Sequence, residues 1–369
     1  MSRAIDFLIV GAGITGAVIA RELHDAGYRV HVVEQRAHVG GNMHDEVHPS
    51  GIRYHVYGPH YFRTSSAALW NYVGRFGSFY PYEAVLQTQV RGKNFHWPLN
   101  RQQMTQTFGD RGPEPKHLAA TPANFEEAML AQLSPEVYHT FIGPYTEKQW
   151  GMPASELSRD LAGRIELRES PDRRLKTSTY QGIPRGGYTH WFEAMLKDIT
   201  VDVGVDFLAC RDAYRWRRKL VYTGPIDRFF DCRHGRLSYR AQRRSHMFFP
   251  DLDKILPCGQ VNLPQREDGP HIRAIEWRHM LEAGEFSGTG TLLTTETPYS
   301  PTDWTELEYP SPDPANRRLY AKYRDMAETM TDTLICGRLG EYRYLDMDQA
   351  LARALKWAQR LIEQDRASQ

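Results

Sequence analysis

The chain has 369 residues, more than a single hydrophobic core usually holds, so we expect two or three domains. Its 46 basic and 45 acidic residues give a net charge of +1, which provides no electrostatic basis for binding nucleic acid or an anionic membrane surface. The longest apolar stretches are far shorter than the ~20 residues of a membrane helix, and the N-terminus lacks a signal-peptide pattern. These features predict a cytoplasmic protein with small-molecule partners and no membrane insertion.

The cysteines give no indication of a metal site. Cys210, Cys232, Cys258 and Cys336 show no C-x-x-C pairing. Such spacing favours neither zinc binding nor a disulfide framework. We therefore expect no metal, and we interpret all four as reduced structural residues.

A short apolar strand runs into a glycine-rich turn within residues 5–16. In a dinucleotide-binding turn, Gly11 permits the tight bend and Gly13 lets the backbone approach a pyrophosphate. Gly16 then allows the following helix to pack closely on the strand. The positive end of that helix faces the phosphates.

The next residues complete the unit and indicate which dinucleotide it binds. We expect a helix over 17–27 and a second strand over 28–33, ended by Glu34, whose carboxylate can bind a ribose hydroxyl. A second glycine turn follows in Gln35, Arg36, Gly40, Gly41 and Asn42. This extension resembles FAD-dependent oxidoreductases of the glutathione-reductase-like and amine-oxidase-like type. In the alternative interpretation, these glycines only relieve strain in a loop.

Further elements are expected in chain order. A helix-like piece spans 71–76, and residues 84–97 alternate about Gly92 and Lys93 as a hairpin would. From about 100 to 165 the pattern is helical, with an amphipathic helix over 124–133 and loop prolines at Pro113, Pro115 and Pro122. The later expected elements are a helix at 189–197, strands at 201–205 and 220–222, and a strand-rich region at about 235–300.

The C-terminus supplies a strand at 333–335, a glycine turn at 337–340 and a helix at 347–362. This unit can close the nucleotide-binding sheet from the other end of the chain and bring Gly337 to the cofactor. Arg338 at the turn can form charge-assisted bonds to a pyrophosphate; the alternative is a surface arginine.

These units predict an α/β fold with a Rossmann-like, glutathione-reductase-like FAD-binding domain, an inserted helical subdomain and an antiparallel substrate sheet. The expected boundaries are 1–83, 185–230 and 315–369 for the FAD-binding domain, 98–170 for the helical subdomain, and 84–97 with 231–314 for the sheet.

Five segments carry rare residue types in a fixed order: Tyr57-Gly58-Pro59-His60, residues 145–151, residues 181–188, residues 222–227 and residues 337–347. Together they resemble the bacterial UDP-galactopyranose mutases. The resemblance implies interconversion of the pyranose and furanose forms of a nucleotide-linked galactose-type sugar. In that family, N5 of reduced FAD attacks the anomeric carbon, so an external reductant such as NAD(P)H is implied. A homodimer or higher oligomer and a role in cell-surface polysaccharide biosynthesis are also implied.

The resemblance also implies roles for individual residues. Arg168 and Arg273 match arginines that bind the diphosphate, as planar guanidinium groups do. His60 matches a histidine near the flavin, and Met347, the final residue of the last segment, is implied at the cofactor. The implied substrate contacts are Phe141 and Asn262 on the base, Trp150 beside the substrate, and Tyr145, Tyr180, Tyr309 and Tyr344 on the diphosphate and sugar, with Tyr344 also at the cofactor.

Two segments depart from the family pattern. Where the family usually has G-P-H-I-F-H-T, Arg63 replaces the second histidine, which places Arg63 among the implied catalytic residues and puts the identity of the sugar in doubt. A C2-acetamido or other modified sugar would offer this arginine an extra acceptor. Residues 275–278 replace a Glu-His-Lys pattern and put the register around Arg273 in doubt.

Two alternatives stay open. A redox flavoenzyme of the amine-oxidase-like class would consume one equivalent of oxidant or reductant for each product. A non-catalytic FAD-binding protein would bind the cofactor without responding to sugar nucleotides. The chain has no second G-x-G-x-x-G for a dedicated NADPH domain, which argues against a self-sufficient reductase.

Overall fold

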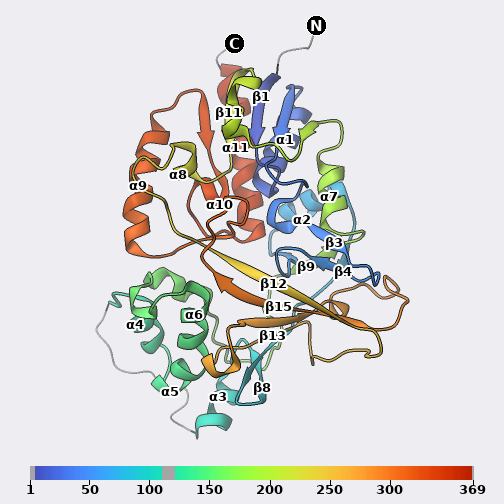
Figure 1. Cartoon of the computed structure of the whole chain (residues 1–369), viewed down its shortest axis with the longest axis vertical. Helices are drawn as coiled ribbons and strands as arrows, with labels where there is room; N and C mark the ends of the chain where they lie inside the picture. Colours follow the sequence, from blue (N-terminus) through green and yellow to red (C-terminus); the bar gives the residue numbers. More distant parts are fainter. Residues whose placement is uncertain (1–4, 110–120, 368–369) are drawn as a thin grey trace.

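The structure is a computed structural model that describes residues 5–109 and 121–367. A five-stranded sheet in the order β10-β2-β1-β11-β17 lies at the end of the molecule where both termini emerge (Figure 1). All its strands are parallel. They come from three separate parts of the chain: β1 (Ile5–Val10), β2 (Val30–Val33), β10 (Thr200–Asp202), β11 (Trp216–Tyr222) and β17 (Thr333–Ile335). The predicted closure of one sheet by the two ends of the chain is thus confirmed.

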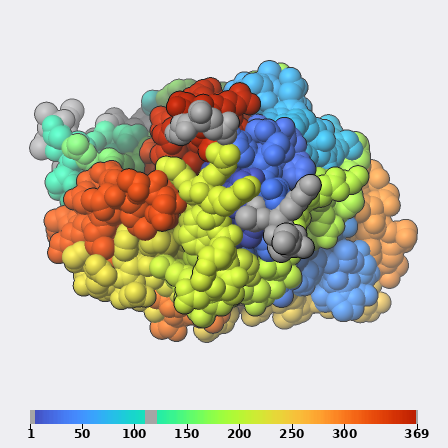
Figure 2. Space-filling view, turned by 90° about the horizontal axis from the view of Figure 1, so that it is seen from above, coloured from blue at the N-terminus to red at the C-terminus, as the bar shows by residue number. Residues whose placement is uncertain are grey.

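Both faces of this sheet are buried, as parallel sheets require. Phe7 and Ile9 of β1 pack in one apolar cluster, while Leu8 and Val10 pack in another on the opposite face. The first face is covered by α1 (Ile14–Asp25), α7 (Tyr188–Met195) and α11 (Met347–Ala367), and α1 packs against α11. In Figure 2 the C-terminal helix and the N-terminal segment are accordingly adjacent on one face.

The glycine turn after β1 is held by close backbone contacts. A Cβ on Gly16 would lie 1.9 Å from the carbonyl oxygen of Gly11, so only glycine lets α1 pack on the turn in this way. Gly11 has a φ of +105°, and a Cβ there would lie 2.0 Å from Thr223 Oγ1 at the end of β11. Helix α1 begins three residues earlier than predicted because Gly13 already serves as its N-cap.

A seven-stranded sheet crosses the middle of the molecule in the order β16-β12-β15-β14-β13-β7-β8 (Figure 1). The long pair of β12 and β15 is antiparallel, and the predicted hairpin of β7 and β8 is present. The bounds are β7 (Leu86–Val90), β8 (Lys93–Trp97), β12 (Tyr239–Phe249), β13 (Gln260–Asn262), β14 (Arg273–Glu276), β15 (Thr291–Tyr299) and β16 (Tyr309–Pro310).

A helical layer packs against the β7–β8 hairpin. Its core contains Val90 of β7 with Phe125, Phe141 and Trp150, and Phe95 packs against it. The layer consists of α3 (Arg101–Phe108), α4 (Phe125–Leu130), α5 (Pro135–Val137), a π-helical turn Tyr138–Ile142 and α6 (Gly143–Trp150). Helix α4 is shorter than the predicted 124–133, and Asn124 is its N-cap. The predicted loop prolines Pro113 and Pro115 lie outside the described residues.

The remaining elements connect these layers. A three-stranded sheet in the order β5-β9-β6 packs in the same apolar cluster as one face of the parallel sheet, and β3 pairs with β4. Helix α2 begins at Ala67, where Ser66 caps it, rather than at the predicted Asn71. The bounds are β3 (Asp45–Val47), β4 (Arg53–His55), β5 (Phe62–Thr64), α2 (Ala67–Val73), β6 (Phe79–Pro81), β9 (Tyr180–Pro184), α8 (Ile226–Phe229), α9 (Pro314–Glu328) and α10 (Gly337–Gly340).

Two sequence-based expectations need a comment. The glycine turn predicted at 337–340 forms the short helix α10 directly after β17. The predicted domain boundaries stay a prediction, although the parallel sheet, the seven-stranded sheet and the helical layer are distinct packing units. Among the described residues, no helix is both long and apolar enough to cross a membrane.

Candidate active site

A pocket of about 200 Å³ opens at the carboxyl edge of the parallel sheet, where nucleotides bind in this class of fold. Gly11 follows β1, Glu34 follows β2 and Gly337 follows β17, so residues from the ends of three strands line the pocket. The predicted cofactor residues that line it are Gly11, Gly13, Glu34, Gln35, Arg36, Gly40, Gly41, Asn42, His60, Gly337, Arg338 and Met347. Two predicted cofactor residues, Gly16 and Tyr344, do not line this pocket. Gly16 packs beneath the glycine turn, and Tyr344 lines a second cavity that adjoins the pocket.

The Glu34 carboxylate is fixed beside the glycine turn. Its Oε2 accepts a hydrogen bond from the backbone N–H of Ala12 at 2.7 Å, and its Oε1 accepts one from the N–H of Arg36 at 2.8 Å. The residue is 7% exposed. A buried carboxylate that is oriented by two amides at the end of β2 suits recognition of ribose hydroxyls.

The two glycine turns touch each other across this pocket. A Cβ on Gly41 would lie 3.0 Å from Cα of Gly13, and Gly40 and Gly41 have φ values of +90° and +56°. Arg36 holds the second turn in place: its Nη1 donates to Asn42 Oδ1 at 2.8 Å, and its Nε and Nη2 both donate to the carbonyl of Thr305. The two turns thus lie close together at the edge of the pocket.

A second cavity of about 320 Å³ adjoins the first. His60, Arg338 and Met347 line both, so the two cavities meet at these residues. The cavity lies between the helical layer, the seven-stranded sheet and β5. The predicted site residues that line it are His60, Arg63, Phe141, Tyr145, Trp150, Asn262, Arg273, Tyr309 and Tyr344.

The cavity wall carries excess positive charge. Of the described residues, four arginines line it, namely Arg63, Arg164, Arg273 and Arg338, against two carboxylates, Glu296 and Asp346. Burial lowers the pKa of His60 to about 3, so this histidine is neutral. Four positive and two negative side chains leave a net charge of +2 around the cavity, which matches a ligand with two negative charges.

Arg273 is held by a buried carboxylate. Its Nε lies 2.8 Å from Glu296 Oε2, and Glu296 Oε1 also pairs with Arg244 at 2.8 Å. Burial opposes ionisation of Glu296, but Arg273 and Arg244 outweigh it and keep its pKa below the ordinary value. In the β13–β14 register, Arg273 pairs with Asn262, so both side chains reach the same cavity despite the unusual residues 275–278.

His60 has a defined tautomer. Its Nδ1 lies 2.7 Å from the carbonyl oxygen of Gly58, which can only accept, so Nδ1 carries the proton. Its backbone N–H donates to His55 Nδ1 at 2.8 Å. The Nε2 of His60 is therefore an unprotonated acceptor in the wall shared by the two cavities.

Two tyrosines stack between arginines in the cavity. The rings of Tyr309 and Tyr344 lie 5.3 Å apart and nearly parallel. The Arg338 guanidinium approaches both rings, at 5.6 and 5.3 Å, and that of Arg164 lies 3.7 Å from the Tyr344 ring centre. The stack holds the two phenols and the two cations in one group.

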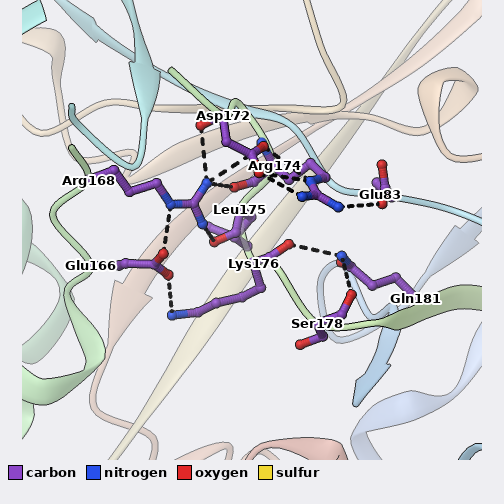
Figure 3. Close-up of polar contacts among 9 residues, drawn as sticks. All are labelled: Glu83, Glu166, Arg168, Asp172, Arg174, Leu175, Lys176, Ser178 and Gln181. Atoms are coloured by element: carbon purple, nitrogen blue, oxygen red, sulfur yellow. Dashed lines mark hydrogen bonds and ion pairs between the residues drawn. The ribbon is translucent and has the colours of Figure 1, made fainter. Parts of the chain in front are cut away.

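Arg168 and Tyr180 are not brought to this cavity. Figure 3 shows that Arg168 turns back onto its own segment: Nε donates to Glu166 Oε1 at 2.7 Å, and Nη1 and Nη2 donate to the backbone carbonyls of Asp172, Arg174 and Leu175. The side chain is 5% exposed. Tyr180 on β9 stacks on Trp70, with ring centres 5.5 Å apart. In this conformation, neither Arg168 nor Tyr180 is placed to make its predicted contact with the diphosphate or the sugar.

Arg164 and Asp346 were missed from the sequence. Arg164 lies four residues before Arg168, and its Nη2 pairs with Asp346 Oδ1 at 2.6 Å. Arg63 Nη2 pairs with the other oxygen, Oδ2, at 3.3 Å. Burial raises the pKa of Asp346, but Arg164 and Arg63 outweigh this effect, so the carboxyl stays below its ordinary pKa and is charged. The available signal was the presence of two arginines in residues 164–168, but their side-chain directions depend on tertiary contacts.

Comparison with known proteins identifies the family. The family model for UDP-galactopyranose mutase matches residues 140–344, and that for an NAD(P)-binding Rossmann-like domain matches residues 9–76. The chain is 32% identical to a probable UDP-galactopyranose mutase from Klebsiella pneumoniae, over 97% of this chain and 94% of that protein. This chain belongs to the UDP-galactopyranose mutase family. It is thus an enzyme of the mutase type, and the family and fold predicted from the sequence are confirmed.

Other relatives define the breadth of the family and of the fold. The chain is 31% identical to dTDP-fucopyranose mutase from Escherichia coli, over 97% of this chain and 99% of that protein. A crystal structure of reduced UDP-galactopyranose mutase superposes with a TM-score of 0.78 at 16% identity, covering 98% of this chain and 94% of that one. A putative protoporphyrinogen oxidase from Exiguobacterium shares the fold with a TM-score of 0.67 at 11% identity, over 98% and 99% of the two chains.

The Arg168 contacts predict a structural role that can be measured. Arg168→Ala would leave three backbone carbonyls without this buried donor and Glu166 with Lys176 alone, so we expect the free energy of unfolding to fall by about 2–3 kcal/mol. Arg174→Ala is the matched control, since its exposed pairs with Asp172 and Glu83 contribute less than about 1 kcal/mol. Chemical denaturation measures both. Equal stability of the two variants would contradict the structural role.

Proposed function

We propose that the chain interconverts the pyranose and furanose forms of a nucleotide-linked galactose-type sugar, with reduced FAD as its cofactor. The observation that carries this proposal is the contact between two cavities at His60. One is a glycine-lined dinucleotide pocket, and the other has a net charge of +2. A nucleoside diphosphate sugar carries two negative charges on its diphosphate, so its charge is complementary to the second cavity.

The residues present fit FAD. Two touching glycine turns leave backbone amides free to approach a pyrophosphate, Glu34 is oriented for a ribose, and Arg338 lies where the pocket meets the substrate cavity. When bound and reduced, FAD supplies the nucleophile for the anomeric carbon. An external reductant such as NAD(P)H would maintain the reduced state. Tyr344 and Met347 would contact the cofactor from the junction of the two cavities.

The arginines of the cavity would bind and stabilise the diphosphate as a leaving group. Arg273 is held in place by Glu296, and Arg164 is held by Asp346 and by the ring of Tyr344. Charge-assisted hydrogen bonds from guanidinium groups to phosphate are among the strongest available in proteins. Arg168 would join them only after giving up its bonds to Glu166 and to the segment 172–175.

The nucleotide base would lie against the helical layer. Phe141 in the π-helical turn is fixed edge-on by Phe95 at 5.1 Å and can stack on a base. Asn262 Oδ1 accepts from Gln260 Nε2 at 2.9 Å, while its amide N–H groups have no partner among the described residues and can donate to the base. Tyr145, Tyr309 and Tyr344 add neutral donors toward the diphosphate, and Trp150 packs beside the substrate.

The neutral His60 and Arg63 would face the sugar. His60 Nε2 can accept a hydrogen bond from a sugar hydroxyl. Arg63 stands three residues after His60, and Asp346 directly precedes Met347, so this pair lies near the junction with the cofactor pocket. Within the described residues, Nε and Nη1 of Arg63 have no hydrogen-bond partner. They can therefore bind an additional acceptor on the sugar, such as the carbonyl of a C2-acetamido group.

Several wider features belong to this proposal. We expect a cytoplasmic homodimer or higher oligomer that supplies a furanose sugar for cell-surface polysaccharide. The domain division at 1–83, 185–230 and 315–369, 98–170, and 84–97 with 231–314 is part of it. Membership of the UDP-galactopyranose mutase family is what supports these statements.

Redox dependence without redox turnover tests the activity. Because the reduced cofactor is regenerated in each cycle, oxidised enzyme should be inactive, while one reduction should support many turnovers. Reduced protein is incubated with UDP-galactose, UDP-N-acetylgalactosamine and dTDP-fucose, and pyranose and furanose products are separated. Consumption of one equivalent of O₂ or another electron acceptor per product would instead support an amine-oxidase-like enzyme.

Arg63 tests the choice of sugar. A site built around a hydrogen-bonded acceptor discriminates strongly against substrates that lack it. We expect the wild type to use the C2-acetamido sugar at least as well as UDP-galactose. In Arg63→His, the kcat/KM for the C2-acetamido sugar divided by that for UDP-galactose should fall by about tenfold or more. Both proteins should retain FAD. An unchanged ratio would show that Arg63 does not select the sugar.

A further inference from the structure

The cavity has two walls that come from different layers of the fold. Helix α6 contributes Tyr145 and Trp150 from the helical layer. The opposite strands contribute Asn262, the last residue of β13, and Arg273, the first residue of β14. The loop between these strands therefore has a residue of the proposed substrate-binding site at each end. The loop thus connects two residues that line the same cavity as Tyr145 and Trp150 of α6.

One side chain on α6 holds both ends of this loop. The ammonium of Lys148 donates to the backbone carbonyls of Leu263 at 2.9 Å, Gln265 at 2.5 Å and His271 at 3.0 Å. Leu263 directly follows Asn262, and His271 lies two residues before Arg273. A lysine has three N–H donors, and here all three are used.

The end of helix α6 that carries Lys148 is itself held in place by hydrogen bonds. The carbonyl of Gln149 accepts from Arg240 Nε at 2.9 Å, and Gln149 Oε1 accepts from Gln242 Nε2 at 2.8 Å, so β12 fixes the end of α6. Gln265 Nε2 also donates to the carbonyl of Thr140 at 2.6 Å. The loop is thus attached to the helical layer at several points, with Lys148 at the centre.

Lys148 does not line the cavity that contains the other site residues, so it does not touch the substrate there. We propose that Lys148 is a positioning residue that holds Asn262 and Arg273 opposite Tyr145 and thereby sets the affinity for the nucleoside diphosphate. This inference rests on the proposed function, because it takes the base and diphosphate to lie between these walls.

The first experiment compares UDP binding by Lys148→Met and wild-type holoenzyme using calorimetry. Methionine keeps most of the length of lysine but donates no hydrogen bond, so three carbonyls lose their partner, and we expect the Kd for UDP to rise by about tenfold or more. FAD content should not change. Arg266→Gln is the matched control on the same loop, because its exposed pair with Glu147 should leave the Kd within about twofold.

A double-mutant cycle separates positioning from a general loss of stability. If Lys148 acts through Arg273, then Lys148→Met should raise the Kd by a smaller factor in an Arg273→Ala background than in the wild type. In an Arg63→His background, where the altered residue lies on the sugar side, the factor should be unchanged. If Lys148→Met does not fold, Lys148→Gln, which keeps two donors, is measured in the same cycle.

The outcomes are distinguishable. If the wild type binds UDP and Lys148→Met binds it with the same Kd, this inference is overturned, while the proposed function stands. Equal factors in the wild-type and Arg273→Ala backgrounds would also overturn it, because the effect would then not pass through Arg273. A wild-type holoenzyme with no affinity for UDP would overturn the proposed function and this inference with it.

Discussion

The proposed substrate cavity depends on arginines that share buried carboxylates. A buried guanidinium without a partner is costly, yet a site for a diphosphate needs positive charge that is not fully neutralised. The protein meets both demands by giving one carboxylate to two arginines. Asp346 pairs with Arg63 and Arg164, and Glu296 pairs with Arg273 and with Arg244, to which Glu308 is also paired.

The fold brings these charges to the cofactor pocket from distant parts of the chain. Asp346 directly precedes α11, Arg63 lies on β5, Arg273 begins β14, and Glu296 lies on β15. The glycine turns after β1 and β2 determine where the cofactor pocket ends, because their backbones touch at Gly13 and Gly41. The parallel sheet therefore forms the proposed cofactor pocket, while the seven-stranded sheet and the helical layer carry charges of the adjoining cavity. These units meet at His60, where we propose that the reaction takes place.

Local sequence carried enough information for the cofactor pocket. The packing roles of Gly11 and Gly16 depend on backbone geometry within a single strand-turn-helix unit, and the structure agrees with the sequence there. Ribose binding by Glu34 stays a prediction. Element ends were less predictable: α2 begins at Ala67 because Ser66 caps it, whereas the hydrophobic pattern alone suggested residue 71. The C-terminal strand could be placed because a glycine turn and an amphipathic helix follow it in the sequence.

The substrate side depended on contacts that local sequence does not encode. Arg164 and Arg168 have the same residue type four positions apart, but Arg164 meets Asp346, 182 residues later, while Arg168 meets its own segment. Lys148 belongs to a segment that resembles the family, but its role is visible only through carbonyls from 115 to 123 residues further along the chain. Tyr180 was expected at the sugar and instead stacks on Trp70.

The excess charge of the cavity is the central claim, and nucleotide affinity tests it most directly. The dissociation constants of uridine, UMP and UDP, with the thymidine series beside them, are measured on the holoenzyme by calorimetry. The account predicts that UDP binds at least about 100-fold more tightly than uridine, and that Arg273→Ala removes most of that difference while leaving uridine affinity unchanged. Equal affinities for the nucleoside and its diphosphate would contradict it.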